Sequence, residues 1–227
     1  MIICTLDHIR KDYQMGEAVT PLKDISLTVQ AGDFIAVEGP SGIGKSTLLY
    51  VMGTLLQSDS GSYLFEGTDV STLTDNERAR LRADKIGFLF QDPTMIQALT
   101  LRENLIFTQR IGRKTDTAQV DALLYRFGLE DRADFFPHQL SGGQRRRAMA
   151  ARCLLHSPKL ILADEPTNDL DEHWSAEISR ALKEQAEQGS AVVMVTHNGR
   201  WANCATRRYR LEDGAVFDIC DKSEENT

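Results

Sequence analysis

The sequence predicts an α/β fold with a mainly parallel sheet and an inserted helical lobe. Short apolar runs typical of buried strands alternate with segments whose apolar residues recur at helical spacing, and this alternation indicates parallel strands joined by helices. The 227 residues are enough for one substantial core, and 41% hydrophobic with 26% charged residues is the balance of an ordinary globular protein. We therefore expect one domain over residues 1–227.

The N-terminal part of the chain predicts strands, a glycine-rich loop and two helices. Residues 25–29 alternate apolar and polar side chains, residues 31–33 form a turn signal, and residues 34–37 are a compact apolar run. Beyond the loop we expect a helix from Lys45 to Gly53, a strand over 61–65, a charged helix opened by the capping box of Thr74 and Glu77 and ending at Arg82, and a strand over 86–90.

The pattern changes between Leu99 and about His156, where apolar residues such as Val120, Leu124 and Phe127 recur at helical spacing. We interpret this stretch as an inserted helical lobe. Alternation then returns, predicting strands over 160–164, 191–196 and 207–212, a helix over 172–187 and a short helix before the last strand. The polar tail after Asp218 is expected to fray. We assign about 1–91 and 157–227 to a catalytic core and about 92–156 to a helical subdomain.

Charge and cysteine usage exclude several classes of protein. The net charge of -7 argues against a partner with a phosphate backbone, and we expect the consecutive arginines 145–147 to form a solvated helix face. Cys4, Cys153, Cys204 and Cys220 have spacings that suit neither zinc nor a disulfide framework, so free thiols in a reducing cytoplasm are expected.

Membrane and export signals are also missing from the sequence. No stretch approaches the ~20 apolar residues of a membrane span, and the first residues lack the basic-then-apolar order of a signal peptide. We therefore expect a cytosolic chain, so that any transport role requires a separate polypeptide in the membrane.

A glycine-rich loop after the strand over 34–37 has the spacing of a phosphate-binding P-loop. Its backbone N–H groups and the following helix N-terminus favour an anion. Lys45 is expected to reach the β- and γ-phosphates, and the Ser46 hydroxyl to ligate Mg²⁺. The loop comprises the candidate nucleotide-binding residues Gly39, Pro40, Ser41, Gly42, Ile43, Gly44, Lys45, Ser46 and Thr47.

An acidic pair ends the apolar strand over 160–164. Carboxylates at the carboxyl edge of a parallel sheet lie where α/β proteins bind ligands. Asp164 is expected to hold Mg²⁺, and Glu165 is placed to orient or deprotonate an attacking water as a general base.

A second glycine-rich stretch, Leu140-Ser-Gly-Gly-Gln, precedes a helical pattern and places Ser141, Gly142, Gly143 and Gln144 at a second anion site. With the P-loop and the acidic pair in this order, the chain resembles the nucleotide-binding subunit of an ABC (ATP-binding cassette) transporter over nearly its whole length. The resemblance implies a P-loop, RecA-like ATPase core with an N-terminal antiparallel β subdomain and a helical signature subdomain.

The resemblance also assigns roles to single residues. Gln91 matches the Q-loop residue that touches Mg²⁺ and the membrane partner, and His197 matches the switch histidine that contacts the γ-phosphate. Tyr13 matches the aromatic residue that stacks on adenine, although a surface tyrosine near a turn is the competing interpretation. Residues 167–171 match the D-loop, which meets the P-loop of a partner subunit.

The implied activity is Mg²⁺-dependent ATP hydrolysis in a homodimer with two ATP sites, because the signature loop of one subunit covers the γ-phosphate on the other. The dimer is expected on the inner face of the cell membrane under a multi-span permease, with no nucleic acid bound. The loop over 14–20, the stretch 81–91 and residues 162–167 are similar to the LolD/MacB/FtsE group, whose members often extrude cargo or transmit force across the envelope. The sequence does not identify the cargo.

Two soluble classes are the alternatives. Asn168 and Asp169 stand where the LolD/MacB/FtsE group usually has Gly followed by Asn or Ala, and the string Thr-Asn-Asp-Leu-Asp is also seen in ABC-F translation factors. Such factors usually carry two cassettes and a long charged linker, neither of which is present. An SMC-type DNA-repair ATPase needs a long coiled-coil insertion, and the insertion here is far too short.

Overall fold

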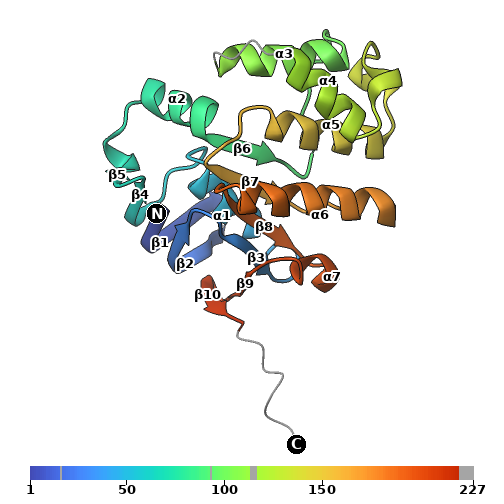
Figure 1. Ribbon diagram of the computed structural model, residues 1–227. Coiled ribbons are helices and arrows are strands. Elements are labelled where there is room, and N and C mark those ends of the chain that lie inside the picture. Colours follow the sequence, from blue (N-terminus) through green and yellow to red (C-terminus); the bar gives the residue numbers. More distant parts are fainter. Residues whose placement is uncertain (16, 93, 113–116, 220–227) are drawn as a thin grey trace, which may run out of the picture.

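The computed structural model describes residues 1–15, 17–92, 94–112 and 117–219 and has the predicted α/β architecture (Figure 1). The helices in these residues are α1 (Lys45–Met52), α2 (Asp75–Lys85), α3 (Leu101–Ile111), α4 (Thr117–Arg126), α5 (Gly142–Leu154), α6 (Glu172–Glu187) and α7 (Gly199–Ala202), with short 3-10 turns at Val70–Thr72, Glu130–Arg132 and Pro137–Gln139. The strands are β1 (Ile2–Met15), β2 (Glu17–Gln30), β3 (Phe34–Glu38), β4 (Ser60–Phe65), β5 (Thr68–Asp69), β6 (Ile86–Leu89), β7 (Leu160–Asp164), β8 (Ala191–Thr196), β9 (Arg207–Glu212) and β10 (Ala215–Asp218).

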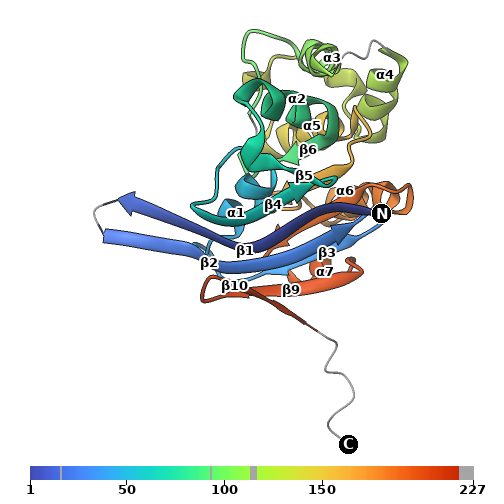
Figure 2. The same ribbon diagram turned by 90° about the vertical axis from the view of Figure 1, so that its left-hand side faces the viewer.

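The strands join in the order β5-β4-β1-β2-β10-β9-β3-β8-β7-β6. One half, β5, β4, β1 and β2, is antiparallel, and β1 and β2 form a long hairpin whose end projects from the rest of the molecule (Figure 2). In the other half, β9, β3, β8, β7 and β6 are parallel neighbours. The helices α3, α4 and α5 lie together above this half, apart from the hairpin (Figures 1 and 2).

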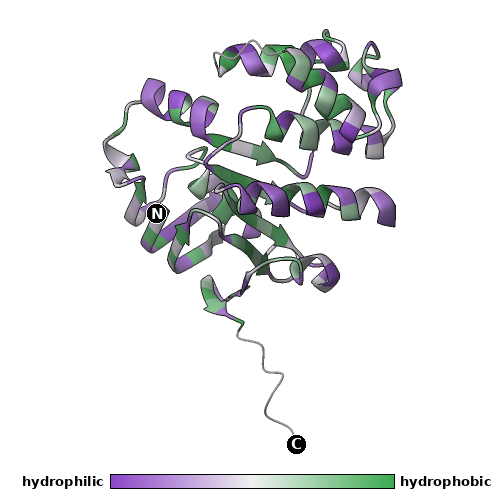
Figure 3. Ribbon diagram, viewed as in Figure 1, coloured by the Kyte–Doolittle hydropathy of each residue, from purple (hydrophilic) through white to green (hydrophobic). Residues whose placement is uncertain are grey.

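Apolar side chains bury β3, β8, β7 and β6 on both faces, and these strands are correspondingly hydrophobic in Figure 3. In β3, Phe34 and Ala36 pack into a cluster with residues of α3–α6, whereas Ile35 and Val37 pack into a second cluster with β1, β2, β4 and α1. This period-2 division explains why the run over 34–37 is continuously apolar rather than alternating. By contrast, α2 has no buried residue and consists mostly of charged side chains.

Most predicted elements are present close to their expected bounds. The helix over 172–187 and the strands over 160–164, 191–196 and 207–212 match, while α2 extends three residues beyond Arg82 to Lys85. The predicted frayed tail beyond Ile219 lies outside the described residues. The boundaries of the helical subdomain, about 92–156, stay a prediction.

Two strands, β5 and β10, were not predicted from the sequence. β10 pairs antiparallel with β9 through the turn at Asp213 and Gly214, whose φ angles are 48° and 76°. Asp-Gly with two positive φ angles is a strong local signal for a tight hairpin, so this strand was detectable from the sequence. β5 has only two residues and carries no such signal.

Three cysteines within the described residues are free thiols: Cys4 and Cys153, which are buried, and Cys204, which is partly buried. Burial raises the pKa of the Cys4 and Cys153 thiols to about 12, so both stay protonated and unreactive at neutral pH. Cys220 lies outside the described residues. Among the helices described, none is long and apolar enough to cross a membrane.

Stability should depend on the packing of α6 against the sheet. Leu182 is 2% exposed and belongs to the larger apolar cluster, whereas the neighbouring Lys183 is exposed. We expect Leu182→Ala to lower the free energy of unfolding by about 2–5 kcal/mol, because it removes buried methyl groups and leaves a cavity. Lys183→Ala is the matched control, with an expected change within about 0.5 kcal/mol. Urea unfolding of both variants tests this, and equal costs would contradict it.

Candidate functional site

The predicted site residues follow four adjacent parallel strands. The P-loop follows β3, His197 follows β8, Glu165 follows β7, and Gln91 lies two residues after β6. Because these strands lie side by side in the order β3-β8-β7-β6, their carboxyl ends meet at one edge of the sheet. A cavity of about 500 Å³ opens there. It is lined by residues of the P-loop, of the β1–β2 hairpin and of the ends of β7 and β8. Among them are Tyr13, Ser41, Gly42, Gly44, Lys45, Ser46, Thr47, Gln91, Asp164, Glu165 and His197.

The P-loop conformation depends on glycine at position 44. Gly44 caps α1 with φ of 117°, in the left-handed region, and a Cβ atom here would lie 2.8 Å from the carbonyl oxygen of Pro21. The loop is therefore packed tightly against β2. The Lys45 ammonium donates to the carbonyl oxygens of Gly39 and Pro40 at 2.7 and 2.9 Å, which holds it over the loop that it is predicted to serve.

Not every P-loop residue faces the cavity. Gly39 and Pro40 contribute through their carbonyl contacts with Lys45. Ile43 is partly buried against the apolar cluster that contains α1, so its side chain anchors the loop instead of facing the ligand space. This explains how an isoleucine is accommodated between two glycines.

Asp164 has the properties of a cation ligand. Its side chain is 4% exposed, and its Oδ2 atom has no hydrogen-bond partner among the described residues. Burial raises the pKa of Asp164, and a hydrogen bond with the Ser46 hydroxyl only partly opposes this shift. The unsatisfied oxygen of Asp164, the Ser46 hydroxyl and the Gln91 amide oxygen nearby together form a set of oxygen donors that suits Mg²⁺. The residues present therefore fit the metal expected from the sequence.

Glu165 and His197 form a direct pair. The Glu165 carboxylate lies 2.8 Å from Nδ1 of His197 and accepts a hydrogen bond from the His197 backbone N–H at 3.1 Å. Since a carboxylate only accepts, this contact requires the proton on Nδ1. The φ angle of 45° at Glu165 shows that the backbone leaves the strand conformation immediately after β7. Both residues were predicted at the site, whereas the direct contact between them was not.

Tyr13 lies on the β1–β2 hairpin and lines the same cavity as the P-loop. The hairpin also contributes Val19, its cross-strand partner, and Pro21, neither of which was predicted. Nothing near Val19 in the sequence indicates this role, because only the strand register identifies the partner of Tyr13.

The second glycine-rich stretch lies at the start of α5. Ser141 caps this helix: its hydroxyl accepts from the Gln144 N–H, and its own N–H donates to the Gln144 side chain. Neither Ser141, Gly142, Gly143 nor Gln144 lines the P-loop cavity. Within one chain, the two glycine-rich loops therefore do not meet on one ligand.

The expectation of a solvated arginine face at 145–147 is wrong. Arg146 is 3% exposed and donates to the carbonyl oxygen of Phe90 at 2.9 Å, while Arg145 donates to that of Leu140 at 3.0 Å. The Arg147 guanidinium stacks on Trp174 with 4.0 Å to the ring centroid. These arginines donate to backbone carbonyls that lie outside the helices and strands. Arg146 thereby connects α5 to the segment just before Gln91.

Comparison with known proteins gives consistent matches. The sequence profile of the ABC transporter family matches residues 22–168. A relative from Syntrophobacter fumaroxidans, named macrolide export ATP-binding/permease protein MacB, is 40% identical over 223 residues, 95% of this chain and 31% of that protein. The protein of the same name from Shigella flexneri is 40% identical over 215 residues, 93% of this chain and 33% of that protein. The chain thus spans about a third of the length of the curated relatives it matches.

Solved structures match over nearly the full length of both chains. A dimeric structure of a post-hydrolysis state of the ATP-binding cassette MJ0796, bound to ADP and Pi, superposes with a TM-score of 0.91 at 34% identity. It covers 96% of this chain and 98% of that chain. A second dimeric structure of MJ0796, described as a bacterial ABC transporter cassette, gives 0.89 at 35% identity, covering 94% of this chain and 96% of that chain. These matches confirm the predicted fold class.

Because the burial of the Asp164 carboxylate is unfavourable, replacing it should increase the free energy of unfolding in a pH-dependent way. An acid whose pKa is raised in the folded state binds more protons folded than unfolded, so stability falls as pH rises from the ordinary value of 3.8 through the raised value. Asp164→Asn lacks this loss. In buffer without nucleotide or divalent cation, we expect the variant to unfold at higher urea than wild type at pH 7.5, with the difference shrinking toward pH 3.5. A variant less stable than wild type at pH 7.5 would contradict this.

Proposed function

The chain belongs to the ABC transporter family, and we propose that it is an ATP-hydrolysing subunit that dimerises on ATP to drive a separate membrane permease in export or force transmission across the envelope. The observation that supports this most is the convergence of Lys45, Ser46, Asp164, Glu165 and His197 on one cavity at the carboxyl edge of the sheet. A phosphate-binding loop, a cation ligand and a paired carboxylate are the groups that phosphoryl transfer to water requires.

Each group has a distinct task in this proposal. Ser46, Gln91 and Asp164 hold Mg²⁺, which neutralises charge on the phosphate oxygens when bound. Lys45 binds the β- and γ-phosphates. Glu165 orients the attacking water and accepts its proton, and the proton on Nδ1 of His197 keeps the Glu165 carboxylate in place. The Nε2 edge of His197 then faces the γ-phosphate, to which it donates in the imidazolium form, with a proton on each ring nitrogen.

Dimerisation supplies the part of the site that one chain lacks. The capping box satisfies the N–H groups of Ser141 and Gln144, but helix geometry gives the amides of Gly142 and Gly143 no acceptor within α5. Ser141 and Gly142 are exposed, so these amides are open to an anion from outside the chain. A second copy related by two-fold symmetry brings them to the γ-phosphate on its partner's P-loop. The dimeric MJ0796 structures support this arrangement.

The proposed membrane partner follows from the relatives. These relatives are named as proteins that combine an ATP-binding part with a permease, and this chain corresponds to about a third of their length. We place the ATPase on the cytoplasmic face of the membrane, in contact with a permease. A groove of about 260 Å³ beside Phe90 has exposed apolar side chains at Ile96, Phe107 and Ile111, a surface suited to a protein contact close to Gln91. The ABC-F alternative is set aside, because these relatives are permease-linked.

Glu165→Gln should separate binding from turnover. The amide retains size and hydrogen bonding but cannot accept the proton of water, so we expect unchanged ATP affinity and ATP hydrolysis slower by about 10²–10⁴-fold. Lys45→Ala is the companion variant, with ATP binding expected to be lost. Steady-state ATPase assays with Mg²⁺ and calorimetric ATP titration measure both effects. Loss of ATP affinity in Glu165→Gln with turnover per bound ATP intact would refute the base assignment.

ATP should control the oligomeric state. Because the nucleotide lies inside the proposed interface, association and binding are linked. We expect Glu165→Gln to shift from monomer to dimer with Mg²⁺ and ATP in light scattering, and to stay monomeric with ADP, which lacks the γ-phosphate. Adding Ser141→Arg should abolish the shift by steric and charge conflict. A dimer of equal strength with ATP, with ADP and without nucleotide would disprove the role given to the second glycine-rich loop.

A further inference from the structure

The nucleotide-base end of the cavity is built on a weakly supported element. Tyr13 and Val19 face each other across the end of the β1–β2 hairpin, and both line the cavity. The pairing of β4 with β1 ends at Arg10 and Ser60, so the hairpin beyond this point projects as a two-stranded ribbon (Figure 2). An isolated two-stranded hairpin is marginally stable in water. Something besides the sheet must therefore hold Tyr13 in position.

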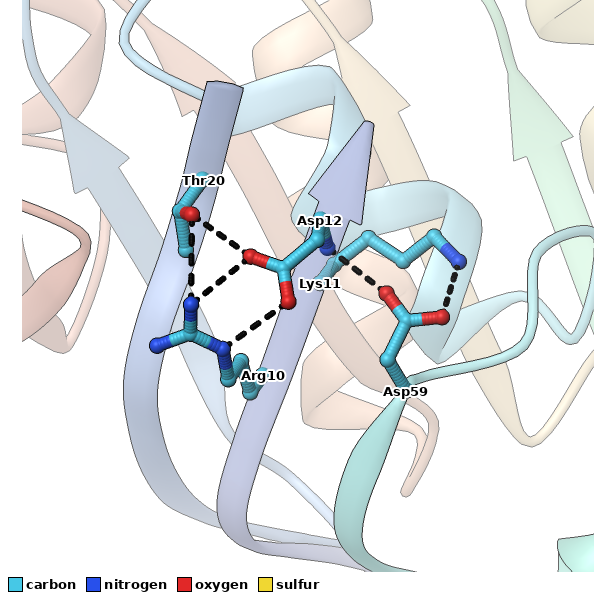
Figure 4. Close-up of polar contacts among 5 residues, drawn as sticks. All are labelled: Arg10, Lys11, Asp12, Thr20 and Asp59. Atoms are coloured by element: carbon cyan, nitrogen blue, oxygen red, sulfur yellow. Dashed lines mark hydrogen bonds and ion pairs between the residues drawn. The ribbon is translucent and has the colours of Figure 1, made fainter. Parts of the chain in front are cut away.

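A polar network supplies this support beside the start of β4 (Figure 4). The Asp59 carboxylate accepts from the Lys11 ammonium at 2.9 Å and from the Asp12 backbone N–H at 2.6 Å. The Asp12 carboxylate accepts from Nε and from one terminal nitrogen of Arg10, both at 2.9 Å, and from the Thr20 hydroxyl at 2.5 Å. We call Arg10, Lys11, Asp12, Thr20 and Asp59 the hairpin brace.

The hairpin brace surrounds an irregularity in the strand register. Lys11 pairs with Leu22 but Tyr13 pairs with Val19, so β2 has one residue more than β1 between these pairs. Such bulges re-aim the side chains beside them. Thr20 lies in the bulge, and the next residue, Pro21, packs on Gly44 of the P-loop. The brace thus fixes the backbone just before Tyr13 and the bulge on the opposite strand.

We propose that the hairpin brace is a positioning device for nucleotide-base recognition, with Asp59 as its central residue. It holds Tyr13 and Val19 against the aromatic base of the bound nucleotide, and it has little influence on how the P-loop binds phosphates. The Lys11 ammonium lies over the Tyr13 ring, 6.0 Å from its centroid, so a base stacks on the opposite face. This inference rests on the proposed function, because it requires that the cavity binds a nucleotide.

The charges in the brace persist at physiological pH. The backbone N–H of Asp12 and the Lys11 ammonium lower the pKa of Asp59, and hydrogen bonds from Arg10 and Thr20 lower that of Asp12. Within the brace, two carboxylates, Asp12 and Asp59, face two cations, Arg10 and Lys11. These opposite charges give the brace a defined geometry.

The test compares two ligands that differ only in the presence of the nucleoside. We expect Asp59→Asn to raise the dissociation constant of ATP by roughly 3- to 10-fold, the range for losing one ordinary hydrogen bond, and that of inorganic tripolyphosphate by less than about 2-fold. Calorimetric titration with Mg²⁺ measures both constants. Thr20→Val, which removes one hydroxyl and retains the side-chain shape, should give the same selectivity. Asp69→Asn is the matched control, because the Asp69 carboxylate accepts from the backbone and side chain of the nearby Ser71 and lies outside the brace.

A double-mutant cycle identifies the route of the effect. If Asp59 acts through Tyr13, then Asp59→Asn should change the ATP dissociation constant by less than about 2-fold in a Tyr13→Ala background. Equal weakening of ATP and tripolyphosphate, additive losses in the cycle, or an unchanged ATP constant in Asp59→Asn would each overturn the proposal. Wild-type protein that binds no ATP would instead overturn the nucleotide site itself.

Discussion

Burial of β3, β8, β7 and β6 on both faces moves the chemistry of this protein to the strand ends. Side chains within these strands pack into two apolar clusters, so no polar group can be placed along their length without a large desolvation cost. The parallel direction then brings four loops to a single edge, where Lys45, Gln91, Glu165 and His197 lie around one cavity. The site forms at this edge because the strands run in the same direction. Its residues lie far apart in the sequence because each follows a different strand.

Residues whose role depends on local backbone chemistry could be predicted from the sequence. Gly44 precedes Lys45 because the loop needs a left-handed residue where Pro21 approaches, and that requirement appears in the sequence as glycine spacing. Asp164 ends an apolar run, which is sufficient to locate it at a sheet edge. Ser141 with Gln144 is a capping box, visible three residues apart.

The remaining features depend on contacts between distant segments. Val19 reaches the cavity only because a bulge shifts its register against Tyr13, and no local pattern encodes that shift. Arg146 is buried because the carbonyl of Phe90, 56 residues earlier, needs a donor, whereas a run of three arginines taken alone suggests solvent. The contact between Glu165 and His197 joins the ends of two neighbouring strands, so strand order had to be known first.

The two ends of the cavity are stabilised by different physical effects. At the phosphate end, Asp164 and Lys45 are less than a tenth exposed and are held by buried strands and backbone carbonyls, which salt screens little. At the opposite end, Tyr13 depends on ion pairs at the surface, such as that between Arg10 and Asp12, whose side chains are 45% and 37% exposed. Exposed pairs are individually weak and are screened by salt. In the proposed function, rigid positioning is thus concentrated where the phosphate bond would break, and the proposed contacts with the base depend on weaker surface pairs.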